Sequence, residues 1–180
     1  MKALLLTVGL GLVAILQAQD PPASGGDTPD VSGKWYLKAM TSDQAMSEKL
    51  ESVTPMTFTV LEGGDLNILI TFQINGQCKK KTLVLKKTSE PGKYTAYEGK
   101  RVVYIKQAQV PDHYILYCEG EYHGQQIRMA KLVGRDPENN EKALEGFQKF
   151  SKAKGLLDQE IFIPKQIDTC SPGGDHEPQA

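Results

Sequence analysis

The 180-residue sequence has few of the residues on which catalytic and metal sites depend. It contains only three histidines, His113, His123 and His176. It has neither the Gly-x-Ser-x-Gly pattern of a serine hydrolase nor the cysteine and histidine spacing of a zinc site. We therefore expect a protein that is not an enzyme and that needs no metal ion and no organic cofactor.

An excess of charge of one sign is also absent. The chain has 21 Lys and Arg residues against 22 Asp and Glu residues, which gives a net charge of -1. This balance provides no electrostatic argument for a nucleic-acid partner or an anionic membrane surface. After the first segment, no stretch is apolar enough to span a bilayer, so we expect no stable membrane insertion.

The first segment has a pattern of its own. Lys2 is followed by an uncharged apolar run over residues 3–16, which is too short to span a bilayer. This order predicts a signal peptide over residues 1–18, with cleavage after Ala18, and hence a secreted, extracellular protein. Residues 19–30 and 171–180 are rich in Pro and Gly and are predicted to be flexible ends of one domain at 31–170.

The three cysteines are too few to pair completely within one chain. Cys170 lies in a Pro/Gly tail that a disulfide would fasten to the body, and Cys78 follows a turn at the start of a strand. Cys118 lies inside a strand-like run, where a free thiol packs as a small apolar group. We predict a Cys78–Cys170 disulfide, which would stabilise by about 4–5 kcal/mol in the chain-entropy model, with Cys118 as the free thiol.

Short apolar runs separated by turn residues fill the chain from residue 33 to residue 132. Asn75-Gly76 is the strongest of the turn signals, since this dipeptide favours a two-residue hairpin. Eight strands at this regular spacing predict an antiparallel barrel or sandwich. The predicted strands cover residues 35–40, 56–61, 66–74, 79–86, 94–97, 101–106, 113–119 and 125–132.

The apolar period then changes to that of a helix. Asp136 is the predicted N-cap, with Pro137 at the first helical position, and Gly155 is the predicted end. Apolar residues at helical spacing predict one buried face, namely Ala143, Leu144, Phe147 and Phe150. Residues 159–163 are predicted as one further strand.

One parity of each strand should face the barrel interior. Lys131 continues the inward parity of strand 125–132, and an inward lysine is costly unless it is solvated or paired. A barrel of eight strands is either filled by side chains or holds one small ligand, and the pattern alone favours neither. The predicted inward residues are Leu37, Met56, Phe58, Leu66, Ile68, Ile70, Phe72, Leu83, Leu85, Val102, Tyr104, Tyr114, Leu116, Ile127, Met129 and Lys131.

Three ordered motifs name a family. Gly33-Lys34-Trp35 resembles the Gly-x-Trp motif of lipocalins, and Gly134-Arg135 resembles their third motif. Asp112-His113-Tyr114 is similar to the second motif but carries His113 in place of its central acid. The resemblance implies an all-β, eight-stranded, antiparallel, up-and-down barrel with one C-terminal helix on its outside. It also implies that Gly33, Trp35 and Arg135 close the barrel base, with Arg135 stacked on Trp35.

The resemblance implies a function as well. It predicts a carrier or scavenger that binds small hydrophobic ligands in its cavity, such as fatty acids, other lipids, odorants or pheromones. Lys131 would then meet a fatty-acid carboxylate, the alternative being a rim lysine that reaches water. Glu51 lies in a connection over residues 41–55 that resembles the lid loop, where an acid would titrate and loosen the lid; otherwise it is an exposed loop acid.

Other partners and functions stay open at this level. The resemblance extends to lipocalin allergens of mammalian saliva and dander, and it leaves room for a cell-surface receptor. We expect a monomer or a weak dimer. The alternative function is inhibition of cysteine proteases in secretions, although the N-terminal segment has no obvious wedge motif.

Overall fold

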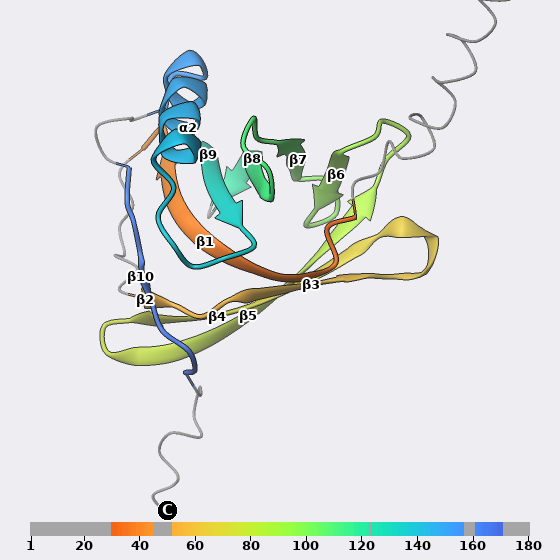
Figure 1. Ribbon diagram of the computed structural model, residues 1–180. Coiled ribbons are helices and arrows are strands. Elements are labelled where there is room, and N and C mark those ends of the chain that lie inside the picture. The colour runs from red at the N-terminus through yellow and green to blue at the C-terminus, as the bar shows by residue number, and fades with distance from the viewer. Residues whose placement is uncertain (1–29, 45–51, 123, 157–160, 171–180) are drawn as a thin grey trace, which may run out of the picture. The chain divides into compact units, whose positions relative to one another are not determined.

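The computed structural model describes residues 30–44, 52–122, 124–156 and 161–170 (Figure 1). The chain divides into two units, Met1–Asp30 and Val31–Ala180. The second unit contains every helix and strand given below. The predicted signal peptide, nearly all of segment 19–30, the tail 171–180 and Glu51 lie outside the described residues.

Within the described residues, ten strands, one 3-10 turn and one helix follow one another. Each of the eight predicted strands is present with small differences at its ends. Two additional strands of two residues each are also present. The bounds are β1 Gly33–Ser42, β2 Ser52–Val53, β3 Met56–Val60, η1 Glu62–Gly64, β4 Leu66–Ile74, β5 Gln77–Lys87, β6 Lys93–Ala96, β7 Arg101–Gln107, β8 His113–Tyr122, β9 Gln125–Gly134, α2 Glu141–Ala153 and β10 Lys165–Gln166.

Eight of these strands form a closed antiparallel barrel. The hydrogen-bonded order runs β4-β3-β1-β9-β8-β7-β6-β5, and β4 also pairs with β5, which closes the ring. Strand β1 has a different partner along each part of its length. Its first three residues pair with β3, and the segment from Tyr36 to Ser42 pairs with β9. Strands β4 and β5 leave a two-residue loop at Asn75-Gly76, as predicted. The expected eight-stranded barrel is therefore confirmed.

Strands β2 and β10 lie outside this ring. β10 pairs in parallel with β2, which itself pairs with the end of β4. The strand predicted over residues 159–163 is not found in its described part, where Phe162 forms only an isolated bridge to Met40. The paired segment lies at β10 instead, so the chain after the helix first contacts β1 at Met40 and then pairs with β2.

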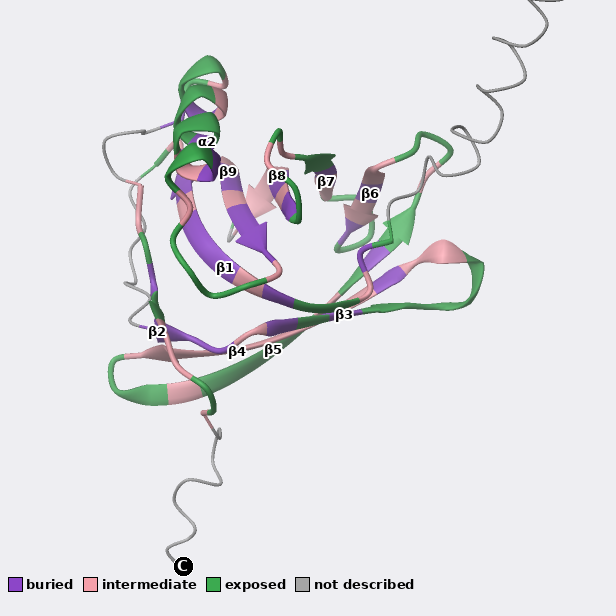
Figure 2. Ribbon diagram, in the orientation of Figure 1, coloured by how far each residue is buried: buried purple, intermediate pink, exposed green. Residues whose placement is uncertain are grey.

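The barrel wall is apolar on two faces. One buried cluster fills its inner side, and a second lies on the outer side of β8 and β9, where α2 covers them (Figures 1 and 2). A bulge between Leu37 and Ala39 shifts the alternation of β1. Leu37 and Met40 therefore belong to the inner cluster, whereas Ala39 belongs to the outer one.

Helix α2 begins later than the sequence suggested. Its N-cap is Asn140, whose side-chain oxygen accepts a hydrogen bond from the Ala143 amide at 2.9 Å. Asp136 was the wrong choice, because it lies four positions before the N-cap, where its carboxylate accepts a hydrogen bond from the Glu138 amide and pairs with Lys38. The C-terminal prediction is confirmed, since Gly155 takes the left-handed conformation (φ +77°) that ends the helix.

The helix attaches to the barrel through one face. Ala143 and Phe147 are buried against Ala130 and Leu132 of β9 in the outer cluster. The helix between Asn140 and Gly155 is short, so its stability comes from this packed stripe rather than from its length. Among the described residues no helix is long and apolar enough to cross a membrane.

One end of the barrel is closed by an aromatic ring and a cation. The Arg135 guanidinium lies over the Trp35 ring at 3.8 Å from its centroid and donates to the Lys34 carbonyl at 3.0 Å. The indole N–H of Trp35 donates to the Val31 carbonyl at 2.8 Å. Gly33 has a φ of +105°, and a Cβ there would lie 3.0 Å from the guanidinium, so both conformation and space favour glycine.

Replacement of Arg135 by alanine should lower the free energy of unfolding by about 1–3 kcal/mol. It removes a cation–π contact of about 1–2 kcal/mol and one hydrogen bond of about 1 kcal/mol. Urea denaturation monitored by Trp35 fluorescence measures the change. Arg135→Lys keeps the charge but loses the planar stacking, and we expect an intermediate value. Equal stability of Arg135→Ala and the wild type would contradict this account of the closed end.

Candidate functional site

Most of the residues predicted to face inward lie on the inner face of the barrel. Seven of them are buried in the inner cluster and four more are partly buried against it. Their role in binding stays a prediction, but their position on one face is a feature of the structure. They are Leu37, Met56, Phe58, Leu66, Ile68, Leu85 and Leu116, followed by Ile70, Phe72, Leu83 and Tyr114.

The prediction for β7 was wrong. Val103 and Ile105 belong to the inner cluster, so Val102 and Tyr104 do not share its parity. Tyr104 packs in the outer cluster with Tyr117, its cross-strand partner, at a ring-centroid distance of 6.2 Å. Because the outer side of this part of the wall is also apolar, alternation of apolar and polar residues does not distinguish the two faces.

Strand β9 is oriented as predicted at its C-terminal half. Cys118 pairs with Met129 and Leu116 pairs with Lys131, and directly paired residues project from the same face. Leu116 and Cys118 contact the inner cluster, so Met129 and Lys131 share its side. Ile127 has the same parity and lies near the end of the strand, half-buried.

Several inner residues were missed by the sequence reasoning. Tyr94 and Ala96 of β6 are fully buried, although their strand has only four residues and gives a weak alternation signal. Val53 lies in a two-residue strand for which no periodic pattern can exist. Val133 continues the inward parity of β9 by two residues beyond Lys131. Met40 follows the inward parity of β1 only after the bulge is taken into account.

Exposure rises along the inner face from one end to the other. In β5, Leu85 is buried, Leu83 is half-buried and Lys81 is exposed. Its partner β4 repeats this trend, with Leu66 and Ile68 buried and Ile70 half-buried. The barrel is thus sealed at the Trp35 end and accessible toward the Lys81 end.

Cationic groups gather at the accessible part of the inner face. Burial lowers the pKa of Lys131, the Cys118 thiol opposes that shift, and the positive charges of Lys81 and Arg101 lower the pKa further. The Arg101 guanidinium lies over Tyr97 at 4.3 Å and Tyr122 at 4.7 Å. Within the described part of the chain, no carboxylate forms an ion pair with any of these three cations.

The cysteines are arranged as predicted. Cys78 and Cys170 form a disulfide with a Cα–Cα distance of 5.7 Å across 92 positions of sequence. Cys118 is free and half-buried. Burial raises the pKa of its thiol, although Lys131 and Arg101 act in the opposite direction. A raised thiol pKa leaves little thiolate at neutral pH, which is the opposite of an activated nucleophile.

His113 has a structural setting. Its Nδ1 lies 2.8 Å from the Pro111 carbonyl, and its Nε2 lies 2.9 Å from the Lys38 ammonium. The ammonium can only donate, so Nε2 accepts and the ring proton is on Nδ1. Lys38 also pairs with Asp136 at 3.2 Å. The carboxylate expected within the second motif is thus supplied by Asp136, after the third motif.

The described residues contain no group of three or more His, Cys, Asp or Glu side chains that could hold a metal ion. The chemistry of the inner face is given by the residues that line it. It combines an apolar wall, a closed end and a positive group near its accessible end. Such an arrangement can hold an apolar body and orient an anionic head.

Replacement of Lys131 by methionine should raise the free energy of unfolding at neutral pH by about 0.5–2 kcal/mol. This is the usual gain when a residue that is unfavourable for stability is replaced. The stem is preserved and the buried charge is removed. The folded-state pKa of Lys131 lies below its ordinary value of 10.5, so the wild type is destabilised by the buried cation at lower pH. It regains stability as pH rises toward 10.5, because the folded state then releases its proton first.

Urea denaturation at pH 7 and at pH 10 measures both effects. The advantage of Lys131→Met should shrink at the higher pH. A variant that is less stable than the wild type at pH 7 would show that the ammonium is paired in the folded protein.

Comparison with known proteins places this geometry in a family context. A model of the Lipocalin / cytosolic fatty-acid binding protein family matches residues 32–168. The chain is 66% identical over 174 residues to the dog protein Major allergen Can f 1, covering 97% of this chain and 99% of that protein. It is 62% identical over 175 residues to pig Lipocalin-1, with the same two coverages.

A more distant relative and a solved structure extend the comparison. Odorant-binding protein 2a of mouse is 43% identical over 174 residues, covering 94% of this chain and 98% of that protein. The solved structure of the siderocalin Ex-FABP has a TM-score of 0.67 and covers 77% of this chain and 99% of its own. Its sequence identity is 21%, so it shows a shared fold alone.

Proposed function

Because the chain belongs to the Lipocalin / cytosolic fatty-acid binding protein family, we propose that it carries small hydrophobic molecules inside its barrel, with fatty acids among them. The observation that supports this function best is the inner face itself. It is apolar, sealed by Trp35 and Arg135 at one end, and increasingly accessible toward Lys81. We propose that the protein binds its ligands without transforming them, as carriers do.

The apolar wall accounts for affinity without narrow selectivity. Each methylene taken out of water contributes roughly 0.8 kcal/mol. A chain of about twelve carbons therefore gains on the order of 10 kcal/mol before association costs, which consume several kcal/mol. Micromolar affinity for many lipids is the expected result. Most of the wall consists of aliphatic, Met and Phe side chains, which do not select one hydrocarbon shape over another by directional contacts.

Lys131 gives the site its preference for an anionic head. Its ammonium is on the inner face beside Met129 and Leu116, where the low dielectric strengthens a charge-assisted hydrogen bond. Lys81 and Arg101 add positive potential at the same place and lower the cost of bringing a carboxylate there. An incoming anion would also relieve the repulsion among the three cations. We therefore propose that the ligand's carboxylate is near Lys131 and its chain extends toward Trp35.

Lys131→Met should weaken binding of laurate about tenfold and leave dodecanol within about twofold, because only the acid loses a charge-assisted interaction worth about 1.5 kcal/mol. Displacement of a fluorescent fatty acid, run with both ligands, measures the two affinities. Lys80→Met is the matched control, since Lys80 is the exposed neighbour of Lys81 with the opposite parity. An equal loss for acid and alcohol would remove the head-group role, and no displacement by any lipid would remove the carrier function.

We also propose that the protein is secreted. The support is the order of Lys2, the apolar run 3–16 and the small residue Ala18, together with the disulfide, which persists in oxidising compartments. Expression of the full chain in mammalian cells should release a protein that begins near Gln19. Intact-mass analysis of the medium under non-reducing conditions tests this, and retention of residues 1–18 on the released protein would contradict it.

A further inference from the structure

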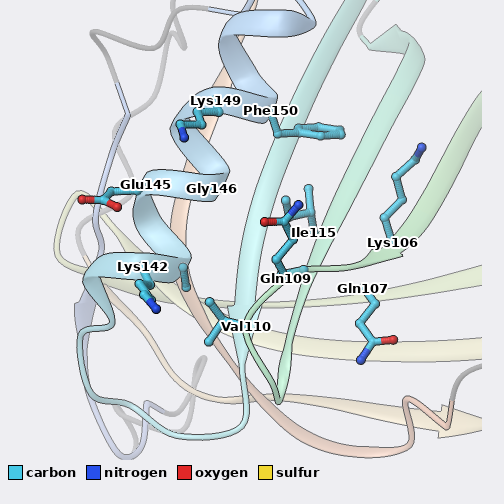
Figure 3. A pocket seen from close by; sticks show the side chains of 12 residues that line it. Lys106, Gln107, Gln109, Val110, Ile115, Lys142, Glu145, Gly146, Lys149 and Phe150 are labelled. Carbon is cyan, nitrogen blue, oxygen red and sulfur yellow. The ribbon is translucent and has the colours of Figure 1, made fainter.

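A second concave site lies outside the barrel. A groove of about 610 Å³ separates helix α2 from the connection between β7 and β8 (Figure 3). None of the residues that line it belongs to the inner cluster, so it is distinct from the site proposed above. Its volume is within the range of small-molecule pockets, about 300–1,000 Å³.

The floor of the groove is apolar. Ile115 of β8 and Phe150 of α2 face each other across it, with Val110 at its lower end in Figure 3. Phe150 also packs edge-on against Tyr117, with ring centroids 5.7 Å apart. These residues border the outer cluster, so the floor is held by the same packing that fixes the helix. The groove is thus an apolar surface kept in place by a rigid support.

Gly146 opens the groove on the helix side. It lies in the interior of α2, where glycine costs about 1 kcal/mol relative to alanine. Ala143, Gly146 and Phe150 are three and four positions apart and share one flank of the helix. A Cβ at Gly146 would meet no atom within 4 Å, so packing does not require glycine there. The residue lowers helix stability and leaves space above the floor.

Three lysines lie at the edges of this space. Lys106 extends from β7 beside its cross-strand partner Ile115, and Lys142 and Lys149 lie seven positions apart on α2. Glu145 is the one acid in the lining, and its carboxylate and the Lys149 ammonium both lie on the side of the helix away from Phe150 and Ile115 (Figure 3). The three lysines belong to a chain whose net charge is -1, so the positive potential here is local.

We propose that this groove is a second binding site, for a small amphiphilic anion with an apolar body and a carboxylate or similar head. The apolar body lies on Ile115 and Phe150, in the space that Gly146 leaves open. The head lies within reach of the lysines at the rim. A groove of this size suits a small molecule better than a protein surface, which would need a broader contact.

The test follows laurate and dodecanol by NMR of the ¹⁵N-labelled protein. Backbone amides of Gln109 and Gly146 report the groove, while those of Leu83 and Cys118 report the lumen, so each site has its own titration. We expect saturable shifts at the groove with laurate and at least tenfold weaker ones with dodecanol. Equal affinities would overturn the assignment of an anionic ligand, and no saturable shift of the groove amides by 1 mM laurate would overturn the site.

Two pairs of variants make the test specific. Gly146→Trp fills the groove and should weaken laurate binding there more than tenfold, whereas Gly146→Ala adds one methyl group and should stay within threefold. Lys142→Gln with Lys149→Gln should weaken the groove titration about tenfold. Lys80→Gln with Lys152→Gln removes the same charge elsewhere and should leave it unchanged. An unaltered groove titration in Gly146→Trp would overturn the proposal.

This experiment tests the groove and the lumen site independently. Shifts at Leu83 and Cys118 without shifts at Gly146 would support the carrier function and remove the groove. Shifts at Gly146 without shifts at Leu83 and Cys118 would support the groove and remove the lumen site.

Discussion

The contact between Arg135 and Trp35 is the constraint on which the rest of the barrel depends. It joins the first residues of β1 to the chain just after β9, and it covers the one tryptophan at the end of the inner face. Because that end is sealed, apolar side chains from β1, β3, β4 and β5 have a floor to pack on. Exposure can then rise in one direction only, toward Lys81, and this gradient gives the barrel a single accessible end.

The accessible end is where stability and binding are opposed. A buried ammonium at Lys131 is unfavourable in the empty protein, and Lys81 and Arg101 increase the repulsion rather than relieve it. In the proposed function, the same three charges attract the anionic head of the ligand. Cys118 shares this environment, yet burial keeps its thiol protonated, so the neighbourhood favours binding over covalent chemistry.

The wall of the barrel has apolar residues on both sides, and this explains where the sequence reasoning succeeded and failed. In β4 the outer residues are more polar than the inner ones, and its inner residues were predicted correctly up to Phe72. In β7 the outer residue Tyr104 packs against Tyr117, so the two parities look alike. The same outer apolar surface continues to Phe150, where Gly146 leaves it uncovered. The groove therefore follows from the way the helix attaches to the barrel.

The sequence by itself determined the eight strands, the helix and its end at Gly155, and the pairing of Cys78 with Cys170, because these depend on local period, turn residues and the place of each cysteine in the chain. The motifs also predicted the Arg135 contact with Trp35. Only the tertiary structure decided the faces of Val102, Tyr104 and Val103, the start of the helix at Asn140, and the use of Asp136 as a partner of Lys38. The faces of the β7 residues and the pairing of Asp136 with Lys38 depend on which groups meet across segments that are distant in sequence. A local pattern specifies that a residue is apolar or can cap a helix, but only the assembled barrel specifies what lies opposite it.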